Sequence, residues 1–139
     1  MAILRQKRAT PAGDSYQTPD WMKQYLATEF RWNYDPCPFN PAFDPAKDVD
    51  GLTTDWTDKV VFVNPPYSNI LPFVEKALAS RCTTILLIPA RTDTPWFRLL
   101  LDAKAEIRFL RKRVDFISAT DGQTKVHPAE ASLLVVVRN

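Results

Sequence analysis

The stretch Val60-Val61-Phe62-Val63-Asn64-Pro65-Pro66-Tyr67-Ser68 decides the fold of this 139-residue chain. Its first four residues are apolar and mostly β-branched, which predicts a short buried strand. Pro65 and Pro66 have no backbone N–H to donate, so the sheet must end there. The prolines also keep the backbone extended as it leaves the strand. Because ligands bind at the carboxyl ends of strands in open α/β sheets, we expect a functional site at residues 64–68.

Apolar patterns on both sides of this stretch predict alternating helices and strands. Thr18-Pro19 is typical of a helix start, with Thr18 as the N-cap and Pro19 at the first helical position. The patterns predict helices at about residues 19–29, 69–81 and 95–101. Strands are expected at residues 32–35, 59–63, 84–88, 106–110, 113–117 and 133–137.

The order strand, helix, strand, helix, strand predicts an α/β fold with right-handed βαβ units and a mainly parallel sheet. The last strands follow one another without a helix, which predicts a C-terminal β-hairpin at one edge. Residues 1–14 carry Arg5, Lys7 and Arg8 and no apolar run, so we expect a flexible basic N-terminal arm. Residues 15–139 then form one domain.

Composition limits the classes of function. The chain is 45% hydrophobic and 24% charged, as in ordinary soluble globular proteins, and no apolar run is long enough to cross a membrane. Its two cysteines, Cys37 and Cys82, make neither a disulfide framework nor a zinc site, so an intracellular compartment is the default. The 3 glycines form no phosphate-binding loop. The net charge of +2 does not demand a nucleic-acid partner, although Arg111, Lys112 and Arg113 cluster.

The side chains after the strand suit chemistry on an exocyclic amino group. The amino nitrogen of adenine is a poor nucleophile because its lone pair is delocalised into the ring. Asn64 Oδ1 and the Pro65 carbonyl offer acceptors for the two amino hydrogens, and the prolines fix the direction of that carbonyl. Tyr67 offers a face on which a base flipped out of the duplex stacks, worth roughly 1–3 kcal/mol. The alternative is a strand terminator followed by a core tyrosine.

Several motifs, spread over about residues 15–137 and so over nearly the whole chain, resemble those of one protein family. The chain resembles the small adenine-N6 DNA methyltransferases of the Dam-like family encoded by phages and other viruses. The matching pieces are Tyr16-Gln17-Thr18-Pro19, Asp35-Pro36-Cys37, Asp50-Gly51-Leu52 with Asp55-Trp56, Asn64-Pro65-Pro66-Tyr67-Ser68, Pro89-Ala90-Arg91-Thr92-Asp93-Thr94 with Trp96-Phe97, and Ala105-Glu106-Ile107-Arg108-Phe109-Leu110.

This resemblance implies a reduced Rossmann-like methyltransferase domain that transfers a methyl group from S-adenosylmethionine to adenine N6 at specific sites in DNA, without a metal. It also implies residue roles. Asn64, Pro65, Pro66 and Tyr67 would hold the target amine. The donor-binding residues would be Gln17, Thr18 and Pro19 against its methionine part, Asp35 and Pro36 at the start of the donor loop, and Asp50 and Leu52 near its adenine. Asp35 and Asp50 are otherwise a loop cap and a turn residue.

The chain also departs from the usual pattern of such enzymes. No glycine-rich loop follows Asp35-Pro36, and the 14 residues between Asp35 and Asp50 are too few for the usual helices and strands of the donor side. No separate target-recognition domain is evident. A homodimer is one arrangement that would cover an exposed sheet edge. The expected location is the cytoplasm, that of the host cell if a phage encodes the chain.

Other functions stay open at this point. The chain is alternatively a non-catalytic nucleic-acid-binding remnant of the fold, or a methyltransferase acting on RNA or protein glutamine. Cys37 is a weaker candidate for a nucleophile of cytosine-C5 chemistry. Arg91 is expected either to pair with Asp93 or to meet a phosphate. The predicted nucleic-acid-binding residues are Arg91, Arg111, Lys112 and Arg113.

Overall fold

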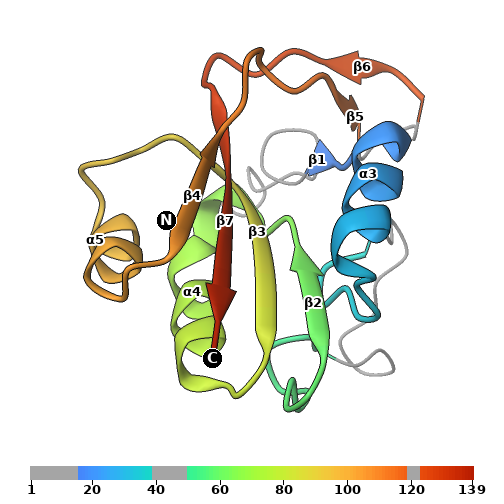
Figure 1. Cartoon of the computed structure of the whole chain (residues 1–139). Helices are drawn as coiled ribbons and strands as arrows, with labels where there is room; N and C mark the ends of the chain where they lie inside the picture. Colours follow the sequence, from blue (N-terminus) through green and yellow to red (C-terminus); the bar gives the residue numbers. More distant parts are fainter. Residues whose placement is uncertain (1–15, 39–49, 119–122) are drawn as a thin grey trace.

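The computed structural model describes residues 16–38, 50–118 and 123–139, which form an α/β arrangement with two sheets (Figure 1). The basic arm predicted for residues 1–14 lies outside these described residues. The helices are α3 (Asp20–Phe30), α4 (Ile70–Ala79), α5 (Pro95–Asp102) and the 3₁₀ turn η1 (Tyr67–Asn69). The strands are β1 (Tyr16–Gln17), β2 (Val60–Val63), β3 (Thr83–Pro89), β4 (Glu106–Phe109), β5 (Phe116–Ser118), β6 (Lys125–Val126) and β7 (Ser132–Arg138).

The large sheet is mixed, which corrects the predicted mainly parallel, Rossmann-like sheet. Its strand order is β2-β3-β7-β4. β2 and β3 pair in parallel, but β7 runs antiparallel to both of its neighbours, β3 and β4. The predicted C-terminal hairpin at the edge is also wrong, because the antiparallel pair there, β4 and β7, is separated in the sequence by β5 and β6. The prediction failed because a strand buried on both faces is a continuous apolar run in either direction.

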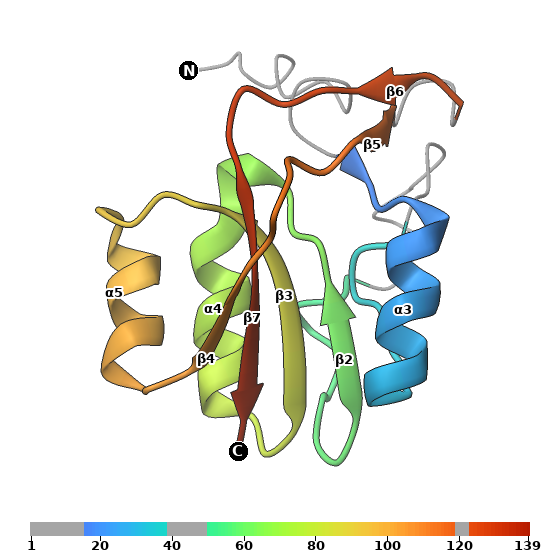
Figure 2. The ribbon, with the colours of Figure 1, turned by 45° about the horizontal axis from the view of Figure 1, so that its top comes forward.

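The small sheet has the order β1-β5-β6 and is antiparallel. It lies beyond the end of β2, at the top of Figure 2. Tyr16 pairs with Ser118 and Gln17 with Ile117, so the segment that precedes α3 is fixed against β5. This pairing holds Tyr16 and Thr18 close to the exit of β2.

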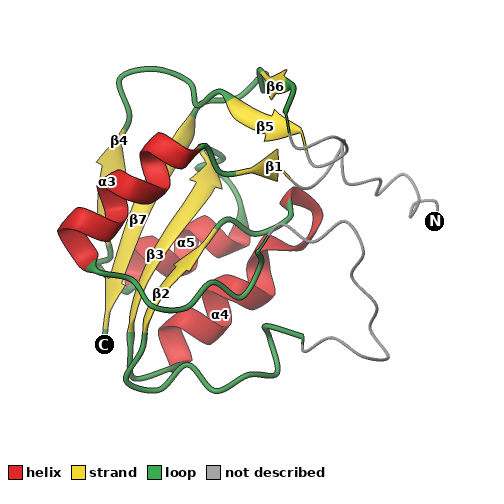
Figure 3. Cartoon of the chain, turned by 90° about the vertical axis from the view of Figure 1, so that its right-hand side faces the viewer, coloured by secondary structure: helices red, strands yellow, loops and turns green. Residues whose placement is uncertain are grey.

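Alternate residues of the large sheet face two different layers. Val61 and Val63 belong to the core cluster that contains the buried side chains of α4 and α5, whereas Phe62 belongs to the cluster of α3. Figure 3 shows α3 on one face of the sheet and α4 and α5 on the other. Because both faces are covered, the central strands are buried nearly throughout. The first polar side chain after β2 is that of Asn64, at the carboxyl end of the strand.

The start of α3 differs from the predicted cap. The N-cap residue is Pro19, and no side chain makes a capping hydrogen bond there. The Thr18 hydroxyl accepts a hydrogen bond from Asn64 instead. By contrast, α5 begins as its sequence predicts, because the Thr94 side chain accepts from the backbone N–H of Phe97. A tertiary contact has therefore replaced a local one at Thr18.

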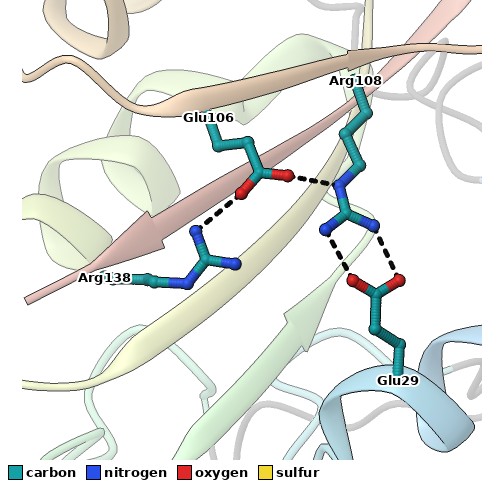
Figure 4. A network of polar contacts seen from close by, with 4 residues as sticks. All are labelled: Glu29, Glu106, Arg108 and Arg138. Carbon is teal, nitrogen blue, oxygen red and sulfur yellow. Dashed lines mark hydrogen bonds and ion pairs between the residues drawn. The ribbon is translucent and has the colours of Figure 1, made fainter.

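Arg108 joins α3 to the large sheet through a charged network (Figure 4). Its guanidinium donates to both Glu29 oxygens at 2.7 and 2.6 Å, and its Nε donates to Glu106 at 2.5 Å. Arg138 of β7 donates to the other Glu106 oxygen at 2.7 Å. Hydrogen bonds from Arg108 and Arg138 hold the pKa values of Glu29 and Glu106 below their ordinary value.

Replacing Arg108 by glutamine should lower stability at neutral pH by about 1 kcal/mol, since the network is partly exposed. The two glutamates have lower pKa values in the folded chain than in the unfolded one. Their stabilisation is therefore present above the ordinary value of 4.5 and is lost as the pH falls through the folded-state values. As the pH is lowered through this range, the melting temperature should fall more steeply for the wild type than for Arg108→Gln. Arg98→Gln, the same change on exposed Arg98, should follow the wild type.

Candidate active site

Several strand ends meet at one end of the large sheet. β2 and β3 are parallel, so Asn64 and Arg91 leave the sheet on the same side. Pro89 pairs with Ser132, and Phe109 pairs with Leu133, so the start of β7 and the end of β4 lie there too. This register places the exits of β2 and β3, the end of β4 and the start of β7 at one end of the large sheet. Arg111, Lys112 and Arg113 follow β4 as exposed residues.

Asn64 stands at the exit of β2 with a fixed amide group. Its Nδ2 donates to the Tyr16 carbonyl oxygen at 2.6 Å and to the Thr18 hydroxyl at 3.1 Å. An amide nitrogen has two hydrogens, and both are used. Within the described ranges, no donor reaches Asn64 Oδ1. The half-buried side chain therefore offers an acceptor, and only an acceptor, to a ligand.

Tyr67 directly follows the two prolines and is the first residue of η1. Its ring meets the Tyr16 ring edge-on, with centroids 5.1 Å apart, and the Arg91 guanidinium lies 5.3 Å from its centroid. Burial raises the pKa of the Tyr67 hydroxyl to about 12. The hydroxyl is therefore protonated at neutral pH, and Tyr67 does not act as a base. Stacking of a base on the Tyr67 ring stays a prediction.

Arg91 pairs with Glu130, and not with Asp93. Arg91 Nε and Nη2 donate to the two Glu130 oxygens at 2.6 and 2.7 Å, a bidentate geometry. This pair joins the end of β3 to the segment before β7, above the Tyr67 ring. Hydrogen bonding to Glu130 raises the pKa of Arg91, and hydrogen bonding to Arg91 lowers the pKa of Glu130. A phosphate contact of Arg91 stays a prediction.

Asp35 lies beside β2, on the outer edge of the large sheet. Tyr34 forms a parallel bridge with Val61, and its carbonyl accepts from the Phe62 N–H at 2.9 Å. The predicted strand at residues 32–35 is therefore reduced to this bridge. Asp35 Oδ1 accepts from the Cys37 N–H at 2.9 Å, and burial raises the pKa of the Asp35 carboxyl to about 6. A buried carboxylate of this kind favours a cationic partner.

The turn that begins at Asp50 packs directly against Pro36. Asp50 Oδ1 accepts from the Leu52 N–H at 2.9 Å. A Cβ added to Gly51 would overlap the Pro36 carbonyl oxygen and lie 2.7 Å from Pro36 Cα. Only a glycine therefore permits this approach. Buried Trp56 fixes the same turn by donating from Nε1 to the Gly51 carbonyl at 3.0 Å. The two segments proposed for the donor are thus brought together.

Cys37 lacks the electrostatic setting of a nucleophile. Burial, together with the nearby charges of Asp35 and Asp50, raises the pKa of its thiol to about 12. A nucleophilic cysteine needs thiolate at neutral pH and hence a lowered pKa. The structure therefore favours the small, partly buried role for Cys37. In the described part of the chain, no group of three or more His, Cys, Asp or Glu side chains has the arrangement of a metal site.

Sequence reasoning missed two groups of this site. One is the Tyr16 carbonyl, which binds Asn64 across 48 positions of sequence. The other is Glu130, 39 positions from Arg91. Neither had a local signal, because a carbonyl is not encoded by a side chain and a lone surface glutamate is common. Gln17 Oε1 is buried with no hydrogen-bond partner among the described residues, which marks it as an acceptor available to a ligand.

Comparisons with known proteins identify the family of this chain. The family model described as DNA N-6-adenine-methyltransferase (Dam) matches residues 5–139. A DNA N-6-adenine-methyltransferase of Haemophilus phage HP1 (strain HP1c1) is 27% identical over 134 residues, a match that covers 88% of this chain and 78% of the relative. No solved structure matches significantly. No helix within the described ranges has the length and apolar character needed to cross a membrane. The chain belongs to the Dam family of DNA N-6-adenine-methyltransferases.

Proposed function

We propose that this chain transfers a methyl group from S-adenosylmethionine to the N6 nitrogen of adenine at specific sites in DNA, with residues 64–67 as the amine-binding site. One observation carries this proposal. Both hydrogens of the Asn64 amide are engaged by Tyr16 and Thr18, so Oδ1 is the atom presented to a ligand. An acceptor fixed in this way suits an amino group and disfavours a keto oxygen. Membership of the Dam family supports the same reaction.

The amine-binding residues act by positioning. Asn64 Oδ1 and the Pro65 carbonyl accept the two amino hydrogens of adenine. These hydrogen bonds favour the state of the amino nitrogen in which its lone pair is free to attack the methyl group. Pro66 stiffens the backbone, and Tyr67 supplies a face for the base. The donor supplies an electrophilic methyl group. Tyr67 stays protonated at neutral pH because its pKa is about 12, so it does not accept the proton that the methylated amine releases.

The residues near Asp35 fit the proposed donor. S-adenosylmethionine carries an ammonium group and ribose hydroxyls, which all donate hydrogen bonds. The buried Asp35 carboxyl and the unpartnered Gln17 Oε1 are acceptors that would hold such donors. The turn from Asp50 to Leu52 is fixed against Pro36 and would hold the donor's adenine. The resemblance also implies that Thr18 and Pro19 lie against the methionine part.

Affinity for S-adenosylmethionine should rise with pH between about 5 and 7. Asp35 has a raised pKa of about 6, so it is mostly neutral at the lower pH and mostly ionised at the higher one. A cation prefers the ionised form, and the ionised fraction changes about tenfold over this range. Calorimetric titration across the range measures the effect. Asp35→Asn, which cannot ionise, should bind weakly with a flat profile; an equally steep profile in this variant contradicts the role of Asp35.

DNA is the proposed partner, and the target adenine must leave the stack to reach Asn64. Exposed Arg111, Lys112 and Arg113 follow β4 at the same end of the sheet, and they are the proposed phosphate contacts together with Arg91. Binding through such contacts weakens with salt. The proposed location is the cytoplasm, where DNA is available, and that of a host cell for a phage-encoded chain.

Homodimerisation stays a prediction. Phe109 on the edge strand β4 is 79% exposed, which is the feature of the structure that favours contact with a second copy. Sedimentation equilibrium measures the assembly state directly.

Product analysis tests the proposed function. Purified protein is incubated with methyl-labelled S-adenosylmethionine and unmethylated DNA, and the DNA is digested to nucleosides. Label in N6-methyl-2′-deoxyadenosine supports the proposal, and label in a methylated deoxycytidine refutes it. Parallel reactions with RNA and with a glutamine-containing protein test the other acceptors. Donor binding measured by calorimetry, with no transfer to any acceptor, would identify a protein that binds the donor for another purpose.

A further inference from the structure

We propose that Thr18 is a positioning residue for methyl transfer, a role that rests on the proposed function of Asn64. Its hydroxyl is the second of the two acceptors that engage the Asn64 amide nitrogen, at 3.1 Å. Thr18 does not touch the reacting nitrogen. It acts through Asn64, by keeping Oδ1 directed at the place where the amine enters.

The orientation of the Asn64 amide follows from the chemistry of its partners. The Tyr16 carbonyl oxygen has no hydrogen and only accepts, so the group that faces it at 2.6 Å must be the NH₂ group. The Thr18 hydroxyl faces the same nitrogen and accepts its second hydrogen. With one acceptor the amide is free to tilt about that single bond. With two acceptors the plane of the amide is defined, and so is the direction of Oδ1.

Thr18 is itself held by elements that do not depend on Asn64. It is 4% exposed and lies between β1, which pairs with β5, and α3, which packs on the large sheet through Met22 and Leu26. Its hydroxyl does not cap the helix, since no side chain makes a capping hydrogen bond at the start of α3. A residue type typical of caps therefore stands just before the N-cap, Pro19, and makes a tertiary contact instead.

The two acceptors also restrict what residue 64 is able to be. An aspartate at this position would place a carboxylate oxygen opposite the Tyr16 carbonyl, and two acceptors with no hydrogen between them repel each other. Asn64→Asp should therefore lose activity in this chain, although aspartate keeps the size and the acceptor oxygen of asparagine. This variant separates the two halves of the amide: the acceptor is kept and the donor is lost.

The resemblance described above instead places Thr18 against the methyl donor, and kinetics separates the two roles. A donor contact, when removed, raises KM for S-adenosylmethionine. A positioning residue, when removed, lowers kcat and leaves that KM within about twofold. Thr18→Val keeps the shape of threonine and removes the acceptor. Thr18→Ser keeps the hydroxyl and removes the methyl group.

We expect Thr18→Val to lower kcat on the order of ten- to a hundredfold. Thr18→Ser should keep most of the wild-type kcat. Thr28→Val, the same substitution at an exposed position of α3, is the matched control and should behave as the wild type. In an Asn64→Ala background, Thr18→Val should add almost nothing, because its partner is absent. Full kcat in Thr18→Val, or a loss confined to the KM for the donor, would overturn the proposal.

A measurement without substrate tests the contact independently of the reaction. Nitrogen-edited magnetic resonance of the free protein should show the Asn64 side-chain amide protons protected from exchange with solvent. Thr18→Val should deprotect one of them, and Thr18→Ser should not. Unchanged protection in Thr18→Val refutes the contact itself. If instead the proposed function is wrong, the wild type would show no methyl transfer, while Thr18→Val would still deprotect the Asn64 amide. The two failures are therefore distinguishable.

Discussion

Replacing Asn64 by alanine should lower kcat for methyl transfer to adenine by about two to three orders of magnitude. The variant removes a preorganised acceptor aimed at the reacting amine, and loss of one such group at an active site typically costs about 10²- to 10³-fold. The acceptor is preorganised because Tyr16 and Thr18 hold the amide before the substrate arrives. Water that fills the vacated space is not oriented in the same way, so it does not replace the lost hydrogen bond.

Transfer of labelled methyl groups to unmethylated DNA measures this effect, with the amount of DNA bound determined in parallel. Asn69→Ala is the matched control, because Asn69 is exposed five positions further on and its side chain makes no capping hydrogen bond. Asn64→Ala should keep its fold, with a loss of stability of about 1 kcal/mol for the broken hydrogen bonds. Wild-type transfer by a folded Asn64→Ala protein would reject Asn64 as the amine-binding residue.

Replacing Gly51 by alanine should weaken binding of S-adenosylmethionine about ten- to a hundredfold. The new Cβ would overlap the Pro36 carbonyl oxygen, and backbone atoms are unable to rotate away as a side chain does. Overpacking of this kind typically costs about 1–3 kcal/mol. The strain is relieved only if the Asp35–Pro36 segment moves away from the turn that begins at Asp50. If binding must restore the arrangement, the same free energy is lost from affinity, at about 1.4 kcal/mol for each factor of ten.

Calorimetric titration and thermal melting of the same samples separate the two consequences of Gly51→Ala. We expect weaker binding together with a lower melting temperature. Gly51→Val has a larger side chain and should show a greater loss of both. Unchanged affinity in Gly51→Ala would show that the contact between Gly51 and Pro36 has no part in the donor site, whatever its effect on stability.

The positions of helices and strands were largely predictable because each has a local cause. The predicted helix at residues 19–29 is α3, Asp20–Phe30, and the predicted strand at residues 84–88 is β3, Thr83–Pro89. Apolar spacing and proline set these limits, and both are visible within a few residues of sequence. The mainly parallel sheet was wrong because strand direction is set by how the chain returns. The excursion through β5 and β6 brings the chain back at the site end, so β7 enters antiparallel.

The candidate site was predictable in part. Asn64, Pro65, Pro66 and Tyr67 are candidates from the sequence because an amide after an apolar run and before two prolines is an unusual pattern with a chemical use. The hydroxyl of Thr18 was assigned to a helix cap because the cap rule considers only neighbouring residues. Its actual partner is 46 positions away. The pairing of Arg91 with Glu130 is equally non-local, so only the folded chain discloses it.

The position of β7 between β3 and β4 also determines the order in which the sheet is able to form. β3 and β4 do not pair with each other, so β3 has one unpaired edge and β4 has no partner in this sheet until residues 132–138 are in place. Such distant pairing makes folding slow, because the loop must close before its contacts form. A chain shortened before Ser132 would leave one edge of β3 and both edges of β4 unpaired, and unpaired strand edges are templates for aggregation. The last strand, β7, therefore joins β4 to β2 and β3 in one sheet.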